Sequence, residues 1–408
     1  MVLEELKNVY NDHIKSQNLL FFKEHPQFVF PVNVLQNDIR GSIEVVRHFG
    51  SNFDPYDVSF LGLNWGVYRQ TICNAFYDSL NKSCDMKSNL LKLKEHSINY
   101  YDYLEKSKID IRNQNADYNL IVPISNRHDH TEIFLHRCTH LVPKEKWCVT
   151  FIIQENNHDL FEKINQWCPE SYRNNINVIS LECDSKIMNR SLCYNLVAMI
   201  VNSKWIINHD IDLLFNENFI SLVEERASDP EVTWFQPFQG SRVILLDENS
   251  SNHIGTLIKE SNHFEIKIPE HLSFPMNNTP HEVGAPGGSI VVKRDDFLSF
   301  GGYDPEFLSG YGPEDALFWY KLECFYGGSE EHKEISKTPF RKENVKPFSH
   351  DSGVDLYHMF HEPSECDVRN VYLNLYSTFW IRNFSDEDFV SKYLSFGLNE
   401  IELEYHKQ

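Results

Sequence analysis

Two aspartates, Asp210 and Asp212, follow a short apolar segment, 204–207, near the middle of the chain. In an extended segment the side chains at positions i and i+2 point to the same side, so we expect both carboxylates to face one pocket. Converging carboxylates repel each other unless a cation lies between them. Oxygen ligands suit a hard divalent ion such as Mg²⁺ or Mn²⁺, and such an ion can bind a diphosphate. The pair alone is also typical of a solvated turn, so its function depends on the rest of the chain.

Two histidines near the other end of the chain, His358 and His361, are a second candidate for metal binding. On a helix, residues three apart face the same side, and both rings could then reach one ion. Imidazole and carboxylate ligands together suit Mn²⁺. In combination with the two aspartates, this spacing predicts a shared metal site.

A second acidic pair, Glu314 and Asp315, directly follows Pro313. Proline suits the first turn of a helix, and acidic side chains there stabilise the helix dipole. We therefore expect a helix that continues over 316–325. The residues alone leave open whether the two carboxylates serve only this helix or also take part in chemistry.

The elements that must position these residues alternate between strands and helices from residue 117 onward. This alternation predicts an α/β fold with a parallel sheet. Ligands of such sheets bind at the carboxyl ends of the strands. Three expected strand ends carry polar clusters, at 125–129, 154–157 and 209–212. The expected strands are 118–124, 148–153, 176–179 and one from 204 into 212; the expected helices are 131–141 and one that starts near 189.

The remaining segments contain fewer signals. In the first region Trp65 and Tyr68 could stack on sugars or simply belong to the core. Residues 229–283 contain several prolines, and we expect short strands and loops there, over the active face. The other expected elements are helices at 3–15, 89–106, 295–300, 367–382 and 386–393, and a strand at 289–292.

Composition limits the function and the setting of the protein. A chain of 408 residues has room for about two to three domains. The net charge of −21 argues against general nucleic-acid binding, which needs cations against phosphates, but leaves room for a basic pocket that binds a nucleotide. Nine cysteines without CxxC spacing favour reduced thiols in the cytosol. Neither a secretory signal nor a membrane span is expected; peripheral membrane contact and the oligomeric state stay open.

The order of these motifs resembles the GT-A glycosyltransferases, most closely the β-1,4-galactosyltransferase type and in part bacterial capsule-polysaccharide glycosyltransferases. The resemblance extends over about 117–363. It implies a GT-A fold, which is nucleotide-diphospho-sugar transferase-like and Rossmann-related. We expect an accessory, mostly helical region at 1–115, the GT-A domain at 116–365 and a C-terminal helical extension at 366–408.

The resemblance assigns donor and metal contacts. The strand and loop 121–127 resemble the family's Pro-x-x-Asn-Arg segment, with a serine at 125 where an earlier arginine is frequent. The segment 188–191 resembles Phe-Asn-Arg-Ala. His358 stands where the family has methionine, which implies a harder metal site. The implied donor residues are Pro123, Ile124, Ser125, Arg127, Arg190, Asp210, Gly287 and Gly288, and the implied metal ligands are Asp212, His358 and His361.

The resemblance also assigns the acceptor side. The segment 310–315 resembles Gly-Trp-Gly-Gly-Glu-Asp, with tyrosine in place of tryptophan and proline in place of a glycine. It implies that Tyr311 stacks on the acceptor sugar, that Glu314 orients it and that Asp315 is the general base.

The function expected from this resemblance is inverting transfer of a sugar from a UDP-sugar to a hydroxyl of a glycan acceptor, with Mn²⁺ or Mg²⁺ as cofactor. Galactose, GalNAc or GlcNAc is the expected sugar, and polysaccharide or surface-glycan synthesis the expected role. The family's secretory anchor and disulfides are not found, which favours a cytoplasmic enzyme of bacterial or viral origin. Two alternatives stay open: a non-catalytic protein that binds glycans or UDP-sugars, and a metal-dependent hydrolase or nucleotidyltransferase acting on nucleotide-sugars.

Overall fold

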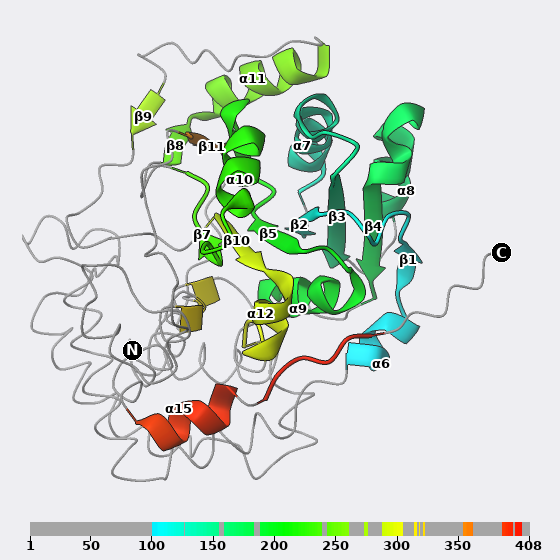
Figure 1. Ribbon diagram of the computed structural model, residues 1–408. Coiled ribbons are helices and arrows are strands. Elements are labelled where there is room, and N and C mark those ends of the chain that lie inside the picture. Colours follow the sequence, from blue (N-terminus) through cyan, green and yellow to red (C-terminus); the bar gives the residue numbers. More distant parts are fainter. Residues whose placement is uncertain are drawn as a thin grey trace, which may run out of the picture.

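A computed structural model shows a mixed α/β unit built on two sheets (Figure 1). The predicted α/β class is confirmed. The residues that the structure describes are 100–125, 127–154, 159–182, 188–238, 243–260, 273–275, 288–304, 314–315, 318, 321–322, 354–361, 386–394 and 396–401.

The larger sheet has seven strands in the order β1-β4-β3-β2-β5-β10-β7. Its central strands β4, β3, β2 and β5 are parallel, as predicted. The sheet is mixed, because β1 is antiparallel to β4 and β10 is antiparallel to both β5 and β7. The bounds are β1 Lys108–Asp110, β2 Tyr118–Ile124, β3 Trp147–Gln154, β4 Ile176–Leu181, β5 Trp205–His209, β7 Trp234–Phe235 and β10 Ser289–Lys293.

Helices cover both faces of this sheet, which is why the central strands are apolar throughout. Every residue of β2 and β3 is buried. Pro123 lacks a backbone donor, yet β2 tolerates it because the pairing with β5 ends at Ile121. Figure 1 shows α7, α8 and α10 on one face and α9 and α12 on the other. Their bounds are α7 His128–Leu141, α8 Asp159–Trp167, α9 Arg190–Ile200, α10 Asn218–Ser228 and α12 Arg294–Ser299.

Helix α7 begins at His128, three residues before the predicted start at 131. The carbonyl of Arg127 accepts hydrogen bonds from the backbone N–H and the hydroxyl of Thr131, at 2.9 and 2.6 Å. The polar residues 128–130, expected as loop, therefore form the first turn of the helix. This change places His130 on a helix beside the candidate site.

Helix α11, Glu248–Glu260, lies in the segment where we expected only short strands and loops, so that prediction was wrong there. Its buried side contains small and polar residues, which hides the helical period. Gly255 packs so closely against α7 that a Cβ atom would lie 2.5 Å from Cδ1 of Ile133. The buried residues are Ser250, Ser251, Ile254, Gly255 and Ile258.

The smaller sheet has four strands in the order β6-β11-β8-β9. It joins parts of the chain that are far apart in sequence, because β11 pairs antiparallel with β6 and parallel with β8. Strand β6 follows β5 after a three-residue turn, so the smaller sheet starts where the larger one ends. The bounds are β6 Leu213–Phe215, β8 Val243–Leu246, β9 Ser273–Pro275 and β11 Leu356–His358.

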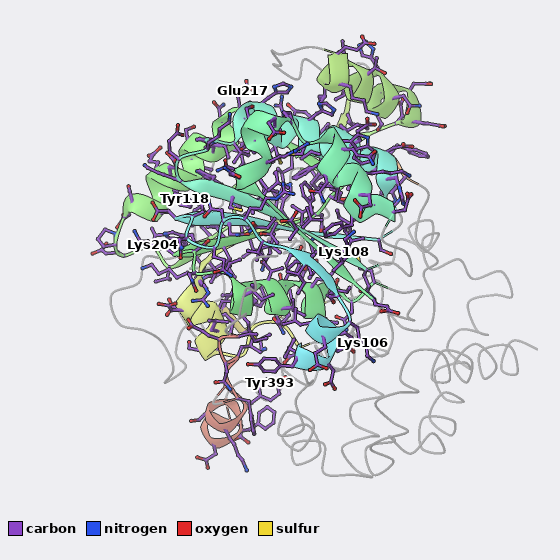
Figure 2. All side chains as sticks on the ribbon, turned by 90° about the vertical axis from the view of Figure 1, so that its right-hand side faces the viewer. Lys106, Lys108, Tyr118, Lys204, Glu217 and Tyr393 are labelled. Carbon is purple, nitrogen blue, oxygen red and sulfur yellow. The ribbon has the colours of Figure 1, made fainter. Side chains whose placement is uncertain are left out.

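The C-terminal residues pack against the face that carries α9 and α12. Helix α15, Glu387–Leu394, agrees with the helix expected at 386–393. The hydroxyl of Tyr393 donates to Asp304 at 2.5 Å, and the buried Lys321 contacts the same carboxylate at 3.1 Å (Figure 2 labels Tyr393). The backbone N–H of Ile401 donates to the carbonyl of Met199 on α9.

Several predictions fall partly or wholly outside the described residues. Helix α6, Tyr100–Glu105, is the described part of the helix expected at 89–106. The expected helices at 3–15 and 367–382 and the aromatic residues Trp65 and Tyr68 lie outside. Of the nine cysteines, the four that the structure describes are buried and form no disulfide. Within the described ranges, no helix is long and apolar enough to cross a bilayer.

The start of α9 provides a test of this local structure. The side chain of Asn189 caps the helix by accepting a hydrogen bond from the backbone N–H of Leu192 at 2.9 Å. We expect Asn189→Ala to lower the free energy of unfolding by about 1 kcal/mol, because one orphan N–H loses its acceptor. Asn189→Ser keeps a capping oxygen and should retain most of the stability in urea unfolding. Equal losses in both variants would contradict the capping role.

Candidate active site

The predicted site residues that the structure describes gather near the carboxyl ends of the parallel strands. Strands β2 and β5 start side by side at the opposite edge, where Lys204 pairs with Asp117 at 3.0 Å (Figure 2 labels Tyr118 and Lys204 there). At the other end, β2 leads into Ser125, and β5 leads into the aspartate pair. The expectation that these strand ends share one region agrees with the general rule for α/β sheets.

The aspartate pair lies on a tight turn between β5 and β6, and the extended conformation that we expected is wrong. The backbone N–H of Leu213 donates to the carbonyl of Asp210 at 3.2 Å and closes the turn. The ring of His209, fully buried, contacts the carbonyl of Leu213 at 2.9 Å. Because of the turn, the two carboxylates have different partners, and the cation beside Asp210 is Arg190, at 2.6 Å.

Asp212 lies beside the two predicted histidines. Its Oδ2 atom is 3.1 Å from Nε2 of His361 and 3.9 Å from Nε2 of His358. One ligand atom from each of the three residues lies within 4.8 Å of the others. Adjacent ligands of an octahedral ion with bonds of about 2.1 Å lie about 3 Å apart, so this donor set fits one small divalent ion.

His358 ends a strand and His361 lies beyond it, so the two histidines do not share a helix, the arrangement in which their spacing of three would place both rings on one side. His358 is the last residue of β11 and lies opposite Leu213 of β6. The next residue, Met359, donates its backbone N–H to the carbonyl of Asp212 at 2.8 Å. The antiparallel register therefore brings together residues about 150 positions apart in the sequence.

The electrostatic environment favours the charge states that metal binding needs. Burial alone would raise the pKa of Asp212, but the hydrogen bond with His361 and the nearby charges of His358 and Arg127 hold that pKa well below its usual range. Burial lowers the pKa of His358, partly offset by Asp212. A carboxylate beside a neutral imidazole is the ligand combination that a divalent ion requires.

Arg190 is the centre of a second cluster, which contains three carboxylates. Besides Asp210, its guanidinium contacts Glu314 and Asp315, each at 3.0 Å. Glu314 is only 3% exposed, and its Oε2 atom has no hydrogen-bond partner among the described residues. Asp210 thus connects the aspartate turn, through one guanidinium, to both residues of the second acidic pair. Residues 314, 315, 318, 321 and 322 are helical, as predicted for this segment.

One cation for three carboxylates, of which Glu314 is buried and the other two are partly buried, leaves excess negative charge, which shifts their protonation. Burial raises the pKa of Asp210 to about 7, against the effect of Arg190. Burial and the adjacent Asp315 raise the pKa of Glu314 to about 8. Burial also raises the pKa of Asp315, although its hydrogen bond with Arg190 opposes the shift. The cluster therefore holds protons near neutral pH and can exchange them.

The other residues expected to contact a donor lie around the same strand ends. Pro123 and Ile124 are the last residues of β2, and Arg127 precedes α7 close enough to affect Asp212 electrostatically. Gly288 has φ +98°, and a Cβ atom there would lie 2.5 Å from Cδ1 of Leu213, so only glycine fits. Its carbonyl accepts the N–H of Asp210 at 3.0 Å. Gly287 and Tyr311 lie outside the described residues.

Two residues near the site were missed by the sequence analysis. His130 on α7 lies with its ring centroid 6.3 Å from that of His361. Tyr194 on α9 has its hydroxyl 3.5 Å from Oδ1 of Asp210. A local signal existed for His130, which stands three residues after Arg127. Tyr194 resembles any other aromatic residue on the buried side of α9.

Comparison with known proteins finds similar solved structures. GalNAc-T7 with UDP, GalNAc and Mn²⁺ matches at 13% identity and a TM-score of 0.43 over 66% of this chain, which spans half the length of that structure. The mannosyltransferase PcManGT from Pyrobaculum calidifontis, with GDP-Man and Mn²⁺, matches at 12% identity and a TM-score of 0.39 over 80% of each chain. Glucosyl-3-phosphoglycerate synthase from Mycobacterium tuberculosis matches at 11% identity and a TM-score of 0.38, over 73% of this chain and 84% of that structure.

These solved structures are GT-A glycosyltransferases, the group that the order of motifs resembles. The chain matches no family model. It also matches no curated protein sequence.

The protonation of Glu314 can be tested through stability. Its pKa is 4.5 ordinarily and about 8 in the fold, so the folded protein binds a proton that the unfolded chain has released, and stability falls as pH rises between these values. Glutamine does not titrate. Relative to wild type, Glu314→Gln should therefore gain stability from about pH 5 to about pH 8, by at most about 1.4 kcal/mol per pH unit.

Urea unfolding at several pH values measures this difference. Glu248→Gln, the same change at an exposed position of α11, is the matched control. A stability difference between wild type and Glu314→Gln that does not change with pH would contradict the raised pKa of Glu314.

Proposed function

We propose that the protein is a metal-dependent GT-A glycosyltransferase that transfers a sugar from a UDP-sugar to a hydroxyl of a glycan acceptor with inversion. One observation carries the proposal: Asp212 of the turn belongs to a three-residue metal-binding geometry, while Asp210 of the same turn is connected through Arg190 to the acidic pair Glu314 and Asp315. A nucleotide-sugar needs both features, a cation for its diphosphate and a base for the attacking hydroxyl.

Asp212, His358 and His361 would hold the ion, Mn²⁺ or Mg²⁺. When bound, the ion supplies Lewis-acid stabilisation for the charge that develops on the leaving diphosphate. His358 and His361 are nitrogen ligands, which favour Mn²⁺ over Mg²⁺. Arg127, whose charge already acts on Asp212, would add a cation beside the phosphates.

The nucleotide and its sugar would lie along the strand ends. Pro123, Ile124 and Ser125 would form the wall that contacts the nucleoside. Gly288, with Gly287 before it, would let the backbone approach the sugar closely, since no side chain projects there.

Asp315 would take the proton from the acceptor hydroxyl. Its raised pKa makes it a stronger base than an ordinary aspartate, and Arg190 holds its carboxylate by two contacts, at 3.0 and 3.3 Å. Glu314, with one buried oxygen that lacks a partner among the described residues, would orient the acceptor sugar. Tyr311 would stack on that sugar. With one base and direct attack, the anomeric centre inverts.

The finer assignments are part of the proposal. We infer galactose, GalNAc or GlcNAc as the sugar, a role in polysaccharide or surface-glycan synthesis, and a cytoplasmic location in a bacterium or virus. We also propose residues 1–115 as an accessory region, 116–365 as the GT-A domain and 366–408 as a C-terminal extension. A panel of UDP-sugars, scored for UDP release with and without acceptor sugars, tests the donor and separates transfer from hydrolysis.

Removing the proposed base should separate binding from transfer. We expect Asp315→Asn to bind UDP with normal affinity but to transfer sugar at least about 100-fold more slowly, the usual contribution of a general base. The control Asp295→Asn changes an aspartate with a 93% exposed side chain and should transfer normally. Near-normal transfer by Asp315→Asn would assign the base to another residue.

Removing the carboxylate of the metal site should abolish the dependence of donor binding on metal. In Asp212→Ala the two histidines remain without their anionic partner, so UDP affinity measured by calorimetry should be the same with and without Mn²⁺. Wild-type protein should bind UDP more tightly with Mn²⁺. If the variant keeps the full Mn²⁺ effect, Asp212 is not a ligand.

A further inference from the structure

Both backbone polar groups of Phe360, the residue before His361, contact side chains from two helices. The backbone N–H of Phe360 donates to Oγ of Ser251 on α11 at 2.7 Å. The carbonyl of Phe360 lies 3.1 Å from Nε2 of His130 on α7, which donates to it as the Nε2–H tautomer. One residue earlier, the backbone N–H of Met359 donates to the backbone carbonyl of Asp212.

His361 depends on these contacts because it lies beyond the strand. β11 ends at His358, so no sheet pairing fixes the three residues that follow. Phe360 is itself exposed, at 38%. The hydrogen bonds to the backbone of its neighbours therefore help to place the His361 ring beside Asp212.

The two helices that supply these bonds form one rigid support. Gly255 of α11 packs closely against Ile133 of α7, and Lys259 of α11 pairs with Glu132 of α7. Helix α7 also starts directly after Arg127. The support thus connects the turn of His361 with the loop proposed to contact the donor.

We propose that His130 and Ser251 are positioning residues for His361 and that they set the affinity of the site for its divalent ion. The inference rests on the metal role in the proposed function. Side chains that orient metal ligands from outside typically contribute about 10- to 100-fold in metal affinity. Here His130 and Ser251 contact the backbone of Phe360 and not the imidazole ring of His361, so they position that ring indirectly.

His130 is assigned this role rather than that of a fourth ligand. The cluster of ligand atoms within 4.8 Å of one another contains Asp212, His358 and His361 but not His130. The Nε2 atom that faces the carbonyl of Phe360 carries the proton, so it has no lone pair for a metal ion. Another side chain that donates a hydrogen bond to the carbonyl of Phe360 from position 130 should therefore keep the function of His130.

The test measures Mn²⁺ binding to the full chain by calorimetry, without nucleotide or sugar. We expect His130→Ala and Ser251→Ala each to bind Mn²⁺ at least about 10-fold more weakly than wild type. His130→Gln keeps an N–H donor at similar reach and should bind Mn²⁺ nearly as tightly as wild type. The matched controls are His136→Ala, half-buried on the same helix, and Ser250→Ala, buried next to Ser251; both should leave the affinity unchanged.

The outcomes separate this inference from the proposed function. Wild-type protein that binds no Mn²⁺ overturns both. Tight binding by wild type together with unchanged affinity in His130→Ala and Ser251→Ala overturns the inference alone. A loss in His130→Gln as large as in His130→Ala also overturns it, because His130 would then act as a ligand. Thermal unfolding of each variant checks the fold, and if His130→Ala does not fold, His130→Gln and Ser251→Ala decide the question.

Discussion

Two neighbouring carboxylates repel each other, and the turn between β5 and β6 gives each of its two aspartates a different partner. Asp210 meets Arg190 at 2.6 Å, while Asp212 meets His361 at 3.1 Å. Both side chains are only partly exposed, so leaving either charge without a partner would destabilise the fold. The turn therefore divides the site into a guanidinium-centred half and an imidazole-centred half, which we interpret as the acceptor side and the metal side.

Both sheets are needed to deliver these partners. The larger sheet presents the turn at the end of β5 and places Gly288, the residue before β10, against it, where the carbonyl of Gly288 accepts the N–H of Asp210. The smaller sheet returns the chain at β11, so that His358 pairs with Leu213. Beyond the strand, α7 and α11 hold the peptide of Phe360, and the metal side is completed by contacts that no single element provides.

The sequence predicted the components of the site better than their local conformations. Strands β2, β3 and β5 were evident from apolar runs, and the polar residues at their ends indicated the location of the site. The joint presence of Asp212, His358 and His361 at one place followed from residue chemistry and from the resemblance. Whether those residues do what the resemblance implies remains a prediction.

The errors have physical causes. Asp210 and Asp212 follow an apolar run, but the change from one sheet to the other forces a turn that periodicity does not reveal. His358 is positioned by pairing with a strand about 150 residues away, and the spacing of the two histidines does not reveal that register. Helix α11 was missed because Ser250, Ser251 and Gly255 occupy its buried side. The contact of His130 with the turn of His361 is purely tertiary and leaves no pattern in either segment.

The most direct test of a shared metal site is pulsed electron paramagnetic resonance of the protein loaded with Mn²⁺ and UDP. We predict nitrogen couplings from two imidazoles on the bound ion, together with phosphorus couplings from the nucleotide. A bound ion that shows phosphorus couplings but no imidazole nitrogen would contradict the assignment of His358 and His361 and with it the division of the site.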